Sequence, residues 1–139
     1  MLTASKQKPV KLQNLAGFTL LELLIVVAII AIIAAIGTPK LIGFISSSKE
    51  ETARNNLQSI YVAQKEYKSD NGRYVISGGG NKTAYLNNAL FSGTNILDTQ
   101  SDYYYYTIGN ATTFQAIAMP IKTGLKRCSI DSSKNLLCY

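Results

Sequence analysis

The chain has 139 residues, with 14 Lys and Arg against 8 Asp and Glu, so its formal net charge is +6. This length gives room for one modest folded domain. The sequence contains no His and only two Cys, which argues against a zinc site or a Cys/His catalytic site. We expect no enzymatic activity, no cofactor and no metal, because carboxylate pairs at useful spacing and nucleophile signatures are also missing.

Residues 1–17 are polar and basic, and their three lysines predict that this end stays on the cytoplasmic side of a membrane. A secretory signal peptide has its apolar region before the cleavage site and loses it on cleavage. Here the small-residue junction Ala16-Gly17 precedes the apolar run, so a cut there would leave the apolar helix at the new N-terminus. Removal of the three lysines would leave 11 basic side chains against 8 acidic ones, a mild charge of +3.

An apolar run follows, and it is apolar on all sides. Residues 18–39, at about 1.5 Å each, predict a helix about 33 Å long, enough to cross the hydrocarbon core of a bilayer. Its one charged residue is Glu22. A carboxylate in hydrocarbon is costly and usually functional, so Glu22 needs a proton or a partner. Pro39, after Gly37, is expected to kink or locally melt the helix where the apolar run ends.

The stretch Gly17-Phe18-Thr19-Leu20-Leu21-Glu22, followed by the apolar run and Pro39, resembles the N-terminal signature of type IV prepilins. The resemblance covers about the first quarter of the chain. It implies cleavage between Gly17 and Phe18 by a membrane peptidase, with methylation of the new amine on Phe18. It also implies that Glu22 acts in assembly by pairing with the N-terminal amine of an adjacent subunit. Pro39 matches the helix-bending proline of the family.

The resemblance implies a structural subunit, a major or minor pilin, that polymerises through its N-terminal helix with copies of itself or with other pilins. The expected partners are a prepilin peptidase and an inner-membrane assembly platform. Before assembly the chain would cross the inner membrane once, with its C-terminal domain in the periplasm. Afterwards it would lie in an extracellular pilus for adhesion, twitching motility or DNA uptake, with a host surface or DNA as a further partner. A type II secretion pseudopilin and a DNA-binding competence minor pilin share the signature and stay open as alternatives.

The family fold is α+β: a long N-terminal helix packed on a C-terminal antiparallel sheet. We accordingly expect a removed leader (1–17), a membrane and filament-core helix (18–39), an amphipathic helix (40–71), a loop region (72–102) and the sheet (103–139). A buried stripe at helical spacing supports the amphipathic helix: Ala53, Leu57, Ile60, Gln64 and Tyr67. Within the loop region, residues 84–91 could form a short helix.

Two β-rich segments, 103–108 and 113–119, flank a plausible hairpin turn, and two short strands follow at 126–130 and 136–139. The first segment contains a run of four tyrosines beginning at Tyr103. Tyrosines in this spacing could stack on bases or sugars, but we favour core and sheet-face positions.

Cys128 and Cys138 are ten positions apart. Outside the cytoplasm they are expected to form a disulfide, which stabilises the fold by about 3 kcal/mol through loop closure. A bridge near the C-terminus also matches the disulfide-bounded region of type IV pilins. The bridge favours a pilus subunit over a pseudopilin, as does the lack of the acidic calcium-binding loop that major pseudopilins usually carry.

Four cations lie around this loop: Lys122, Lys126, Arg127 and Lys134. They could contact a DNA backbone or another polyanion. A solvated rim is the interpretation that we favour, because the expected charge after cleavage is only +3.

Overall fold

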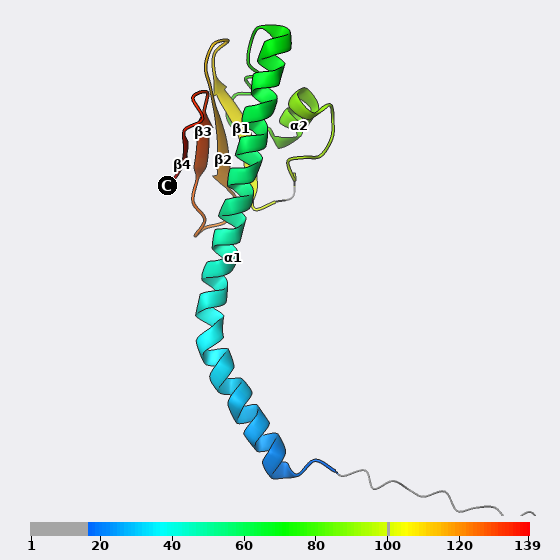
Figure 1. Ribbon diagram of the computed structural model, residues 1–139, viewed down its shortest axis with the longest axis vertical. Coiled ribbons are helices and arrows are strands. Elements are labelled where there is room, and N and C mark those ends of the chain that lie inside the picture. The colour runs from blue at the N-terminus through cyan, green and yellow to red at the C-terminus, as the bar shows by residue number, and fades with distance from the viewer. Residues whose placement is uncertain (1–16, 100) are drawn as a thin grey trace, which may run out of the picture. The chain divides into compact units, whose positions relative to one another are not determined.

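The computed structural model describes residues 17–99 and 101–139, and the chain divides into two compact units, Met1–Thr38 and Pro39–Tyr139. Helix α1 (Leu20–Asn71) belongs to both units (Figure 1). The first unit contributes the apolar start of α1. The second contains the rest of α1, a short helix and four strands. Of the leader expected over residues 1–17, residues 1–16 lie outside the described residues.

The second unit has an antiparallel sheet in which sequential strands are neighbours, in the order β1-β2-β3-β4. Its strands are β1 (Tyr103–Gly109), β2 (Phe114–Pro120), β3 (Cys128–Asp131) and β4 (Leu136–Cys138). The α+β prediction is confirmed, as is the hairpin between the first two strands. The third strand begins two residues later than its sequence pattern suggested, because β3 pairs with β2 only from Cys128 onward.

The β1–β2 turn depends on a glycine and an asparagine. Gly109 has φ +138°, and a Cβ there would lie 2.4 Å from the Thr113 carbonyl oxygen, so no other residue fits. The Asn110 side-chain oxygen accepts hydrogen bonds from the backbone N–H groups of Thr112 and Thr113. This Asx-type arrangement sets the register in which Gly109 pairs with Phe114.

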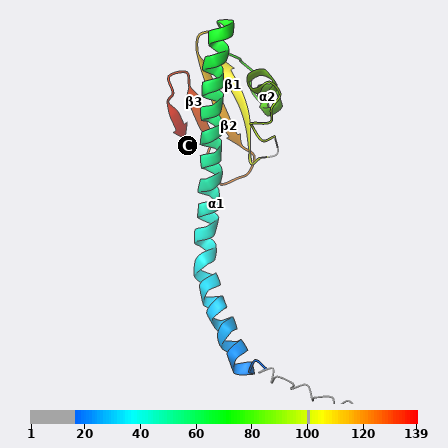
Figure 2. The ribbon, with the colours of Figure 1, turned by 45° about the vertical axis from the view of Figure 1, so that its right-hand side comes forward.

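The second half of α1 lies across one face of this sheet, and α2 (Thr83–Phe91) lies beside β1 (Figures 1 and 2). The predicted stripe is confirmed: four of its five residues, Ala53, Leu57, Ile60 and Gln64, have no exposed surface, and Tyr67 packs half-buried at the edge of the core. The small side chains Ala116 and Ala118 of β2 belong to the same buried cluster as this stripe.

Two side-chain amides tie the region between α1 and β1 to the helices. The buried Gln64 amide donates to the Val75 carbonyl (2.7 Å) and accepts from the Val75 N–H (2.8 Å). Asn87 in α2 holds Leu97 in the same way, at 2.8 and 2.9 Å. The buried backbone N–H and C=O groups of Val75 and Leu97 need hydrogen-bond partners, and these two amides supply them in place of a neighbouring strand. The region between α1 and β1 is therefore packed against the helices and is not a loose surface loop.

The Gln64→Leu variant is therefore expected to unfold more easily, by about 2 kcal/mol, because it leaves the buried Val75 N–H without an acceptor. Urea denaturation of the full chain in detergent, followed by circular dichroism, measures the change. Gln58→Leu on the exposed face of α1 is the matched control. Equal midpoints for the two variants would contradict a stabilising role for the Gln64 amide.

Candidate functional site

The first turn of α1 is closed by a reciprocal pair of hydrogen bonds between Thr19 and Glu22. The Thr19 hydroxyl oxygen accepts the Glu22 backbone N–H at 3.2 Å. One carboxylate oxygen of Glu22 accepts the Thr19 backbone N–H at 3.1 Å and its hydroxyl at 3.0 Å. This is a capping box, with Thr19 as the N-cap, since its carbonyl accepts the first helical bond from Leu23.

The capping box gives Glu22 a polar partner inside its own chain. From the sequence we expected a proton or a positively charged partner for this carboxylate. Thr19 was not considered, although the pattern T-x-x-E at the start of an apolar run is the sequence signature of such a cap. Both donors come from one residue and both go to one oxygen, Oε2. The second carboxylate oxygen, Oε1, accepts no hydrogen bond within the described residues.

The apolar side chains after this cap have no partners within the described part of the chain. Every described residue from Gly17 to Thr38 is exposed, including Leu20 (88%) and Ile33 (65%). By length and composition, α1 is the one helix among the described residues that could cross a membrane. Side chains this apolar need lipid or another protein surface around them.

Helix α1 continues without a break through Gly37, Thr38 and Pro39, so the local melting that we considered at Pro39 does not occur. Directly before Pro39, the Thr38 hydroxyl donates to the carbonyl of Ala34, one turn back, at 2.7 Å. A kink at Pro39 stays a prediction, as does its role in assembly.

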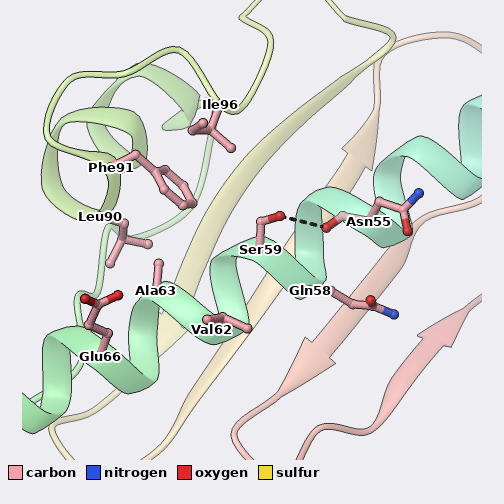
Figure 3. Close-up of a pocket in the computed structure, with 9 residues that line it drawn as sticks. All are labelled: Asn55, Gln58, Ser59, Val62, Ala63, Glu66, Leu90, Phe91 and Ile96. Atoms are coloured by element: carbon pink, nitrogen blue, oxygen red, sulfur yellow. Dashed lines mark hydrogen bonds between the residues drawn. The ribbon is translucent and has the colours of Figure 1, made fainter.

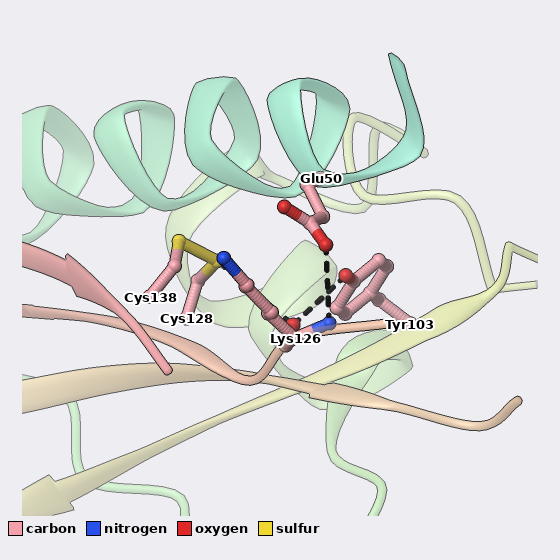
Figure 4. The surroundings of a disulfide bond; sticks show 5 residues. All are labelled: Glu50, Tyr103, Lys126, Cys128 and Cys138. Atoms are coloured by element: carbon pink, nitrogen blue, oxygen red, sulfur yellow. Dashed lines mark hydrogen bonds between the residues drawn. A yellow bond between two sulfur atoms is a disulfide. The ribbon is translucent and has the colours of Figure 1, made fainter. Parts of the chain in front are cut away.

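Cys128 and Cys138 form the expected disulfide. They are directly opposed across β3 and β4, with their Cα atoms 4.1 Å apart. Two hydrogen bonds to the backbone of Lys126 hold the chain just before the bridge (Figure 4). The Lys126 N–H donates to the Glu50 carboxylate of α1 at 3.4 Å, and the Lys126 carbonyl accepts from the Tyr103 hydroxyl at 2.9 Å. Burial, together with the Glu50 charge, raises the pKa of Tyr103 to about 12, so this phenol stays a donor.

The four cations around the disulfide do not form one cluster. Lys122 is paired with Asp102, and the guanidinium carbon of Arg127 lies 5.4 Å from the centre of the Tyr139 ring. Lys134 lies in the β3–β4 turn, at the opposite end of that hairpin from Lys126 and Arg127. Because the cations are separated and partly engaged, the solvated-rim interpretation gains support, and DNA contact stays a prediction.

The tyrosines of β1 are core and sheet-face residues, as we favoured. Tyr103 and Tyr105 are buried against α1, and the Tyr105 hydroxyl accepts a hydrogen bond from Asn56 at 2.8 Å. Tyr104 and Tyr106, on the other face, are half-buried with ring centres 6.2 Å apart.

A three-residue ion network also links α1 to the strands. Asp102, just before β1, pairs with Lys122 and with Lys49 of α1 (2.7 Å to the latter). Hydrogen bonds from Lys122 and Lys49 hold the pKa of Asp102 below its ordinary value of about 3.8. Such a carboxyl group stabilises the fold above its ordinary pKa, and this contribution is lost as the pH falls through the lowered pKa.

We therefore expect the Asp102→Asn variant to lose less stability than the original chain when the pH falls below about 4. Urea midpoints measured from about pH 6 down to about pH 3 test this, with the exposed Asp70→Asn as control. Parallel pH profiles for the original chain and Asp102→Asn would show that the network adds no stability.

The family comparisons concern the N-terminal segment above all. The model of the prokaryotic N-terminal methylation motif matches residues 13–38, which include the cap at Thr19 and Glu22. The chain carries this methylation motif. Gly17 and Phe18 lie inside the matched stretch, whereas Pro39 follows its last residue. The long helix, antiparallel sheet and C-terminal disulfide are consistent with the type IV pilin fold.

Relatives include both pili and secretion machines. The type IV major pilin protein PilA of Myxococcus xanthus is 53% identical over 58 residues, which cover 42% of this chain and 26% of that protein. The type IV wide pilus major component PilA4 of Thermus thermophilus is 40% identical over 64 residues, 46% of this chain and 49% of that protein. The type II secretion system core protein G of Aeromonas hydrophila is 36% identical over 59 residues, 42% of this chain and 41% of that protein.

The matches thus span between about a quarter and half of the length of these relatives. No solved structure matches the chain. The sequence similarity to pilins therefore covers less than half of this chain, and the arrangement of helix, sheet and disulfide is consistent with it.

Proposed function

We propose that this chain is a structural subunit of a type IV pilus that polymerises through the first half of α1. One observation carries the proposal: the apolar first half of α1, in which every described side chain is exposed, begins at the Thr19–Glu22 capping box within the methylation motif. Such a surface is stable in lipid before assembly and against the same surface of other subunits after it. Transfer between these two environments exchanges one apolar contact for another.

Processing between Gly17 and Phe18 by a prepilin peptidase, with methylation of the new amine, would place a positive charge next to the capping box. The chain would then wait in the inner membrane, with the unit after Pro39 on the periplasmic side, until an assembly platform adds it to the filament. Glu22 keeps one carboxylate oxygen unused by Thr19, and that oxygen suits an amine from an adjacent subunit. A buried pair of this kind sets register more than it adds stability.

A type II secretion pseudopilin is the second candidate, because relatives named as core protein G match the chain at 33–36% identity. The higher identity to a major pilin and the disulfide favour the pilus. Adhesion, twitching motility and DNA uptake are the activities such a pilus would serve.

The test is to shear surface filaments from cells that produce the chain and to examine them by mass spectrometry. We expect an abundant chain that begins at N-methylated Phe18 and has lost residues 1–17. Filaments that lack this chain, with the processed protein confined to the cell envelope and needed for secretion, would support the pseudopilin instead.

A further inference from the structure

An open groove of about 620 Å³ lies beside Val62, between α1 and the end of α2 (Figure 3). Its α1 wall is mostly polar and includes Asn55 and Gln58, whereas its α2 wall is apolar and includes Phe91. Glu66 carries a negative charge there, and no Lys or Arg is among the described residues that line the groove. The groove therefore disfavours acidic ligands.

A second hollow, the turn pocket, has a volume of about 360 Å³. It is lined by Tyr67 at the end of α1, residues 73–76 after that helix, Tyr85 of α2, and residues 109–111 at the β1–β2 turn. The end of α1 and this turn lie at the same end of the second unit (Figure 1). Small-molecule sites usually have volumes of about 300–1,000 Å³, so the turn pocket can hold one small ligand.

Hydrogen bonds within the chain hold the walls of the turn pocket in place. The Gln64 amide holds both backbone groups of Val75. The Asn110 side-chain oxygen holds the turn, and the Lys68 ammonium group donates to the Thr112 carbonyl at 3.4 Å, which ties the turn to α1. Because the walls are already ordered, a ligand does not have to order them on binding.

Several polar groups of the pocket are left without a partner inside the described part of the chain. The guanidinium group of Arg73 forms no hydrogen bond or ion pair there, and neither do the Asn110 amide nitrogen and the hydroxyls of Tyr67 and Tyr85. Tyr85 is 50% exposed, so its ring can be reached from solvent. No Asp or Glu is among the described lining residues. The pocket therefore offers one cation, neutral hydrogen-bonding groups and aromatic rings.

We propose that the turn pocket binds a sugar unit that carries a carboxylate, such as a uronic acid in a glycan. Arg73 binds the carboxylate, because its planar fork of N–H groups matches the two carboxylate oxygens. A sugar ring has C–H groups on its faces, and these pack against the electron-rich face of a tyrosine ring. The Asn110 amide and the hydroxyls of Tyr67 and Tyr85 serve the sugar hydroxyls around the ring edge.

The make-up of the pocket favours an acidic sugar over other anions. A small free anion would use Arg73 and leave the two tyrosine rings without a role. A nucleotide could stack on a ring, but phosphate sites usually add several cations or a helix N-terminus, and Arg73 is the one cation among the described lining residues. The neutral polar groups come from α1, α2 and the turn, so they surround a ligand as ring hydroxyls require.

An NMR titration of the full chain in detergent, labelled with nitrogen-15, tests the proposal. Methyl glucuronide is expected to shift the backbone amides of Arg73, Gly109 and Ala111 and to saturate them in the millimolar range. Methyl glucoside, which has a hydroxymethyl group in place of the carboxylate, should bind about tenfold more weakly, as should acetate. Arg73→Gln should lower the affinity for the glucuronide about tenfold, to the level of the glucoside.

Arg54→Gln is the matched control, because it removes the same charge from α1 outside the turn pocket. Tyr85→Leu should weaken both sugars by the same factor, since it removes a ring and a hydroxyl that both sugars use. Both Arg73 and Tyr85 are exposed, so their variants should keep the fold, which the same spectra report. No shift at these amides, equal affinity for acetate and glucuronide, or tighter binding of adenosine monophosphate would each overturn the acidic sugar as the ligand.

Discussion

The Glu22→Ala chain is expected to enter the membrane and be processed at Gly17, but to yield on the order of a hundredfold fewer surface filaments. Alanine removes both the acceptor of the capping box and the charge available to an adjacent subunit's amine. Yield is measured by shearing and quantifying filaments, and processing by the mass of the chain in the envelope. Normal filament yield in this variant would contradict an assembly role for Glu22.

Two further variants separate the cap from the charge. Glu22→Gln keeps a side chain that can accept from Thr19 but has no negative charge, since glutamine also serves in capping boxes. Thr19→Val keeps the charge and the shape but loses the hydroxyl that accepts the Glu22 N–H. We expect Glu22→Gln to fail almost as completely as alanine, and Thr19→Val to assemble at a reduced level. If Thr19→Val failed more completely than Glu22→Gln, Glu22 would act by capping the start of α1 and not through its charge.

Replacement of both cysteines by alanine is expected to lower the free energy of unfolding by about 3 kcal/mol, because the unfolded chain regains the entropy of a ten-residue loop. Cys128 and Cys138 are opposed in the sheet and close its last strand, which consists of only three residues. We therefore also expect β4 to fray first. Urea denaturation of the full chain in detergent gives the free energy, and hydrogen exchange reports on the strand.

Reduction of the original chain is the matched control for this variant. Dithiothreitol should lower the urea midpoint of the original chain to nearly that of the double alanine variant, and leave the variant itself unchanged. A variant as stable as the oxidised original chain would mean that the contacts of Lys126 with Glu50 and Tyr103 hold this end of the sheet by themselves.

The two halves of α1 illustrate what periodicity can predict. In the first half, apolar residues on every side of the helix predict an apolar environment all around it, and this prediction needs no knowledge of the tertiary structure. In the second half, the stripe from Ala53 to Tyr67 predicted the buried face, including the polar Gln64. The stripe could not predict why Gln64 is tolerated, because its partner Val75 is brought to it by the turn after α1.

Charge patterns were less informative than apolar ones. The sequence grouped Lys122, Lys126, Arg127 and Lys134 by closeness along the chain, but a hairpin places the last of them at its far end. The partner of Lys122 is Asp102, twenty positions earlier, and only the sheet brings them together. The partner of a charged side chain depends on which strands and helices lie next to it in the fold, and no local sequence pattern records this. Exposed charges that lie further apart are screened by salt.

The sequence by itself predicted the apolar helix with Glu22 and the disulfide from local spacing and residue type, and the α+β class with the help of the family resemblance; the processing junction stays a prediction. The T-x-x-E cap was equally readable there. Only the tertiary structure decided how the region between α1 and β1 is held, since Gln64 and Asn87 bind peptide groups about ten residues away. It also created the groove beside Val62, because that surface needs α2 to lie against α1. Local spacing specifies elements, whereas a surface made by two elements depends on how they pack.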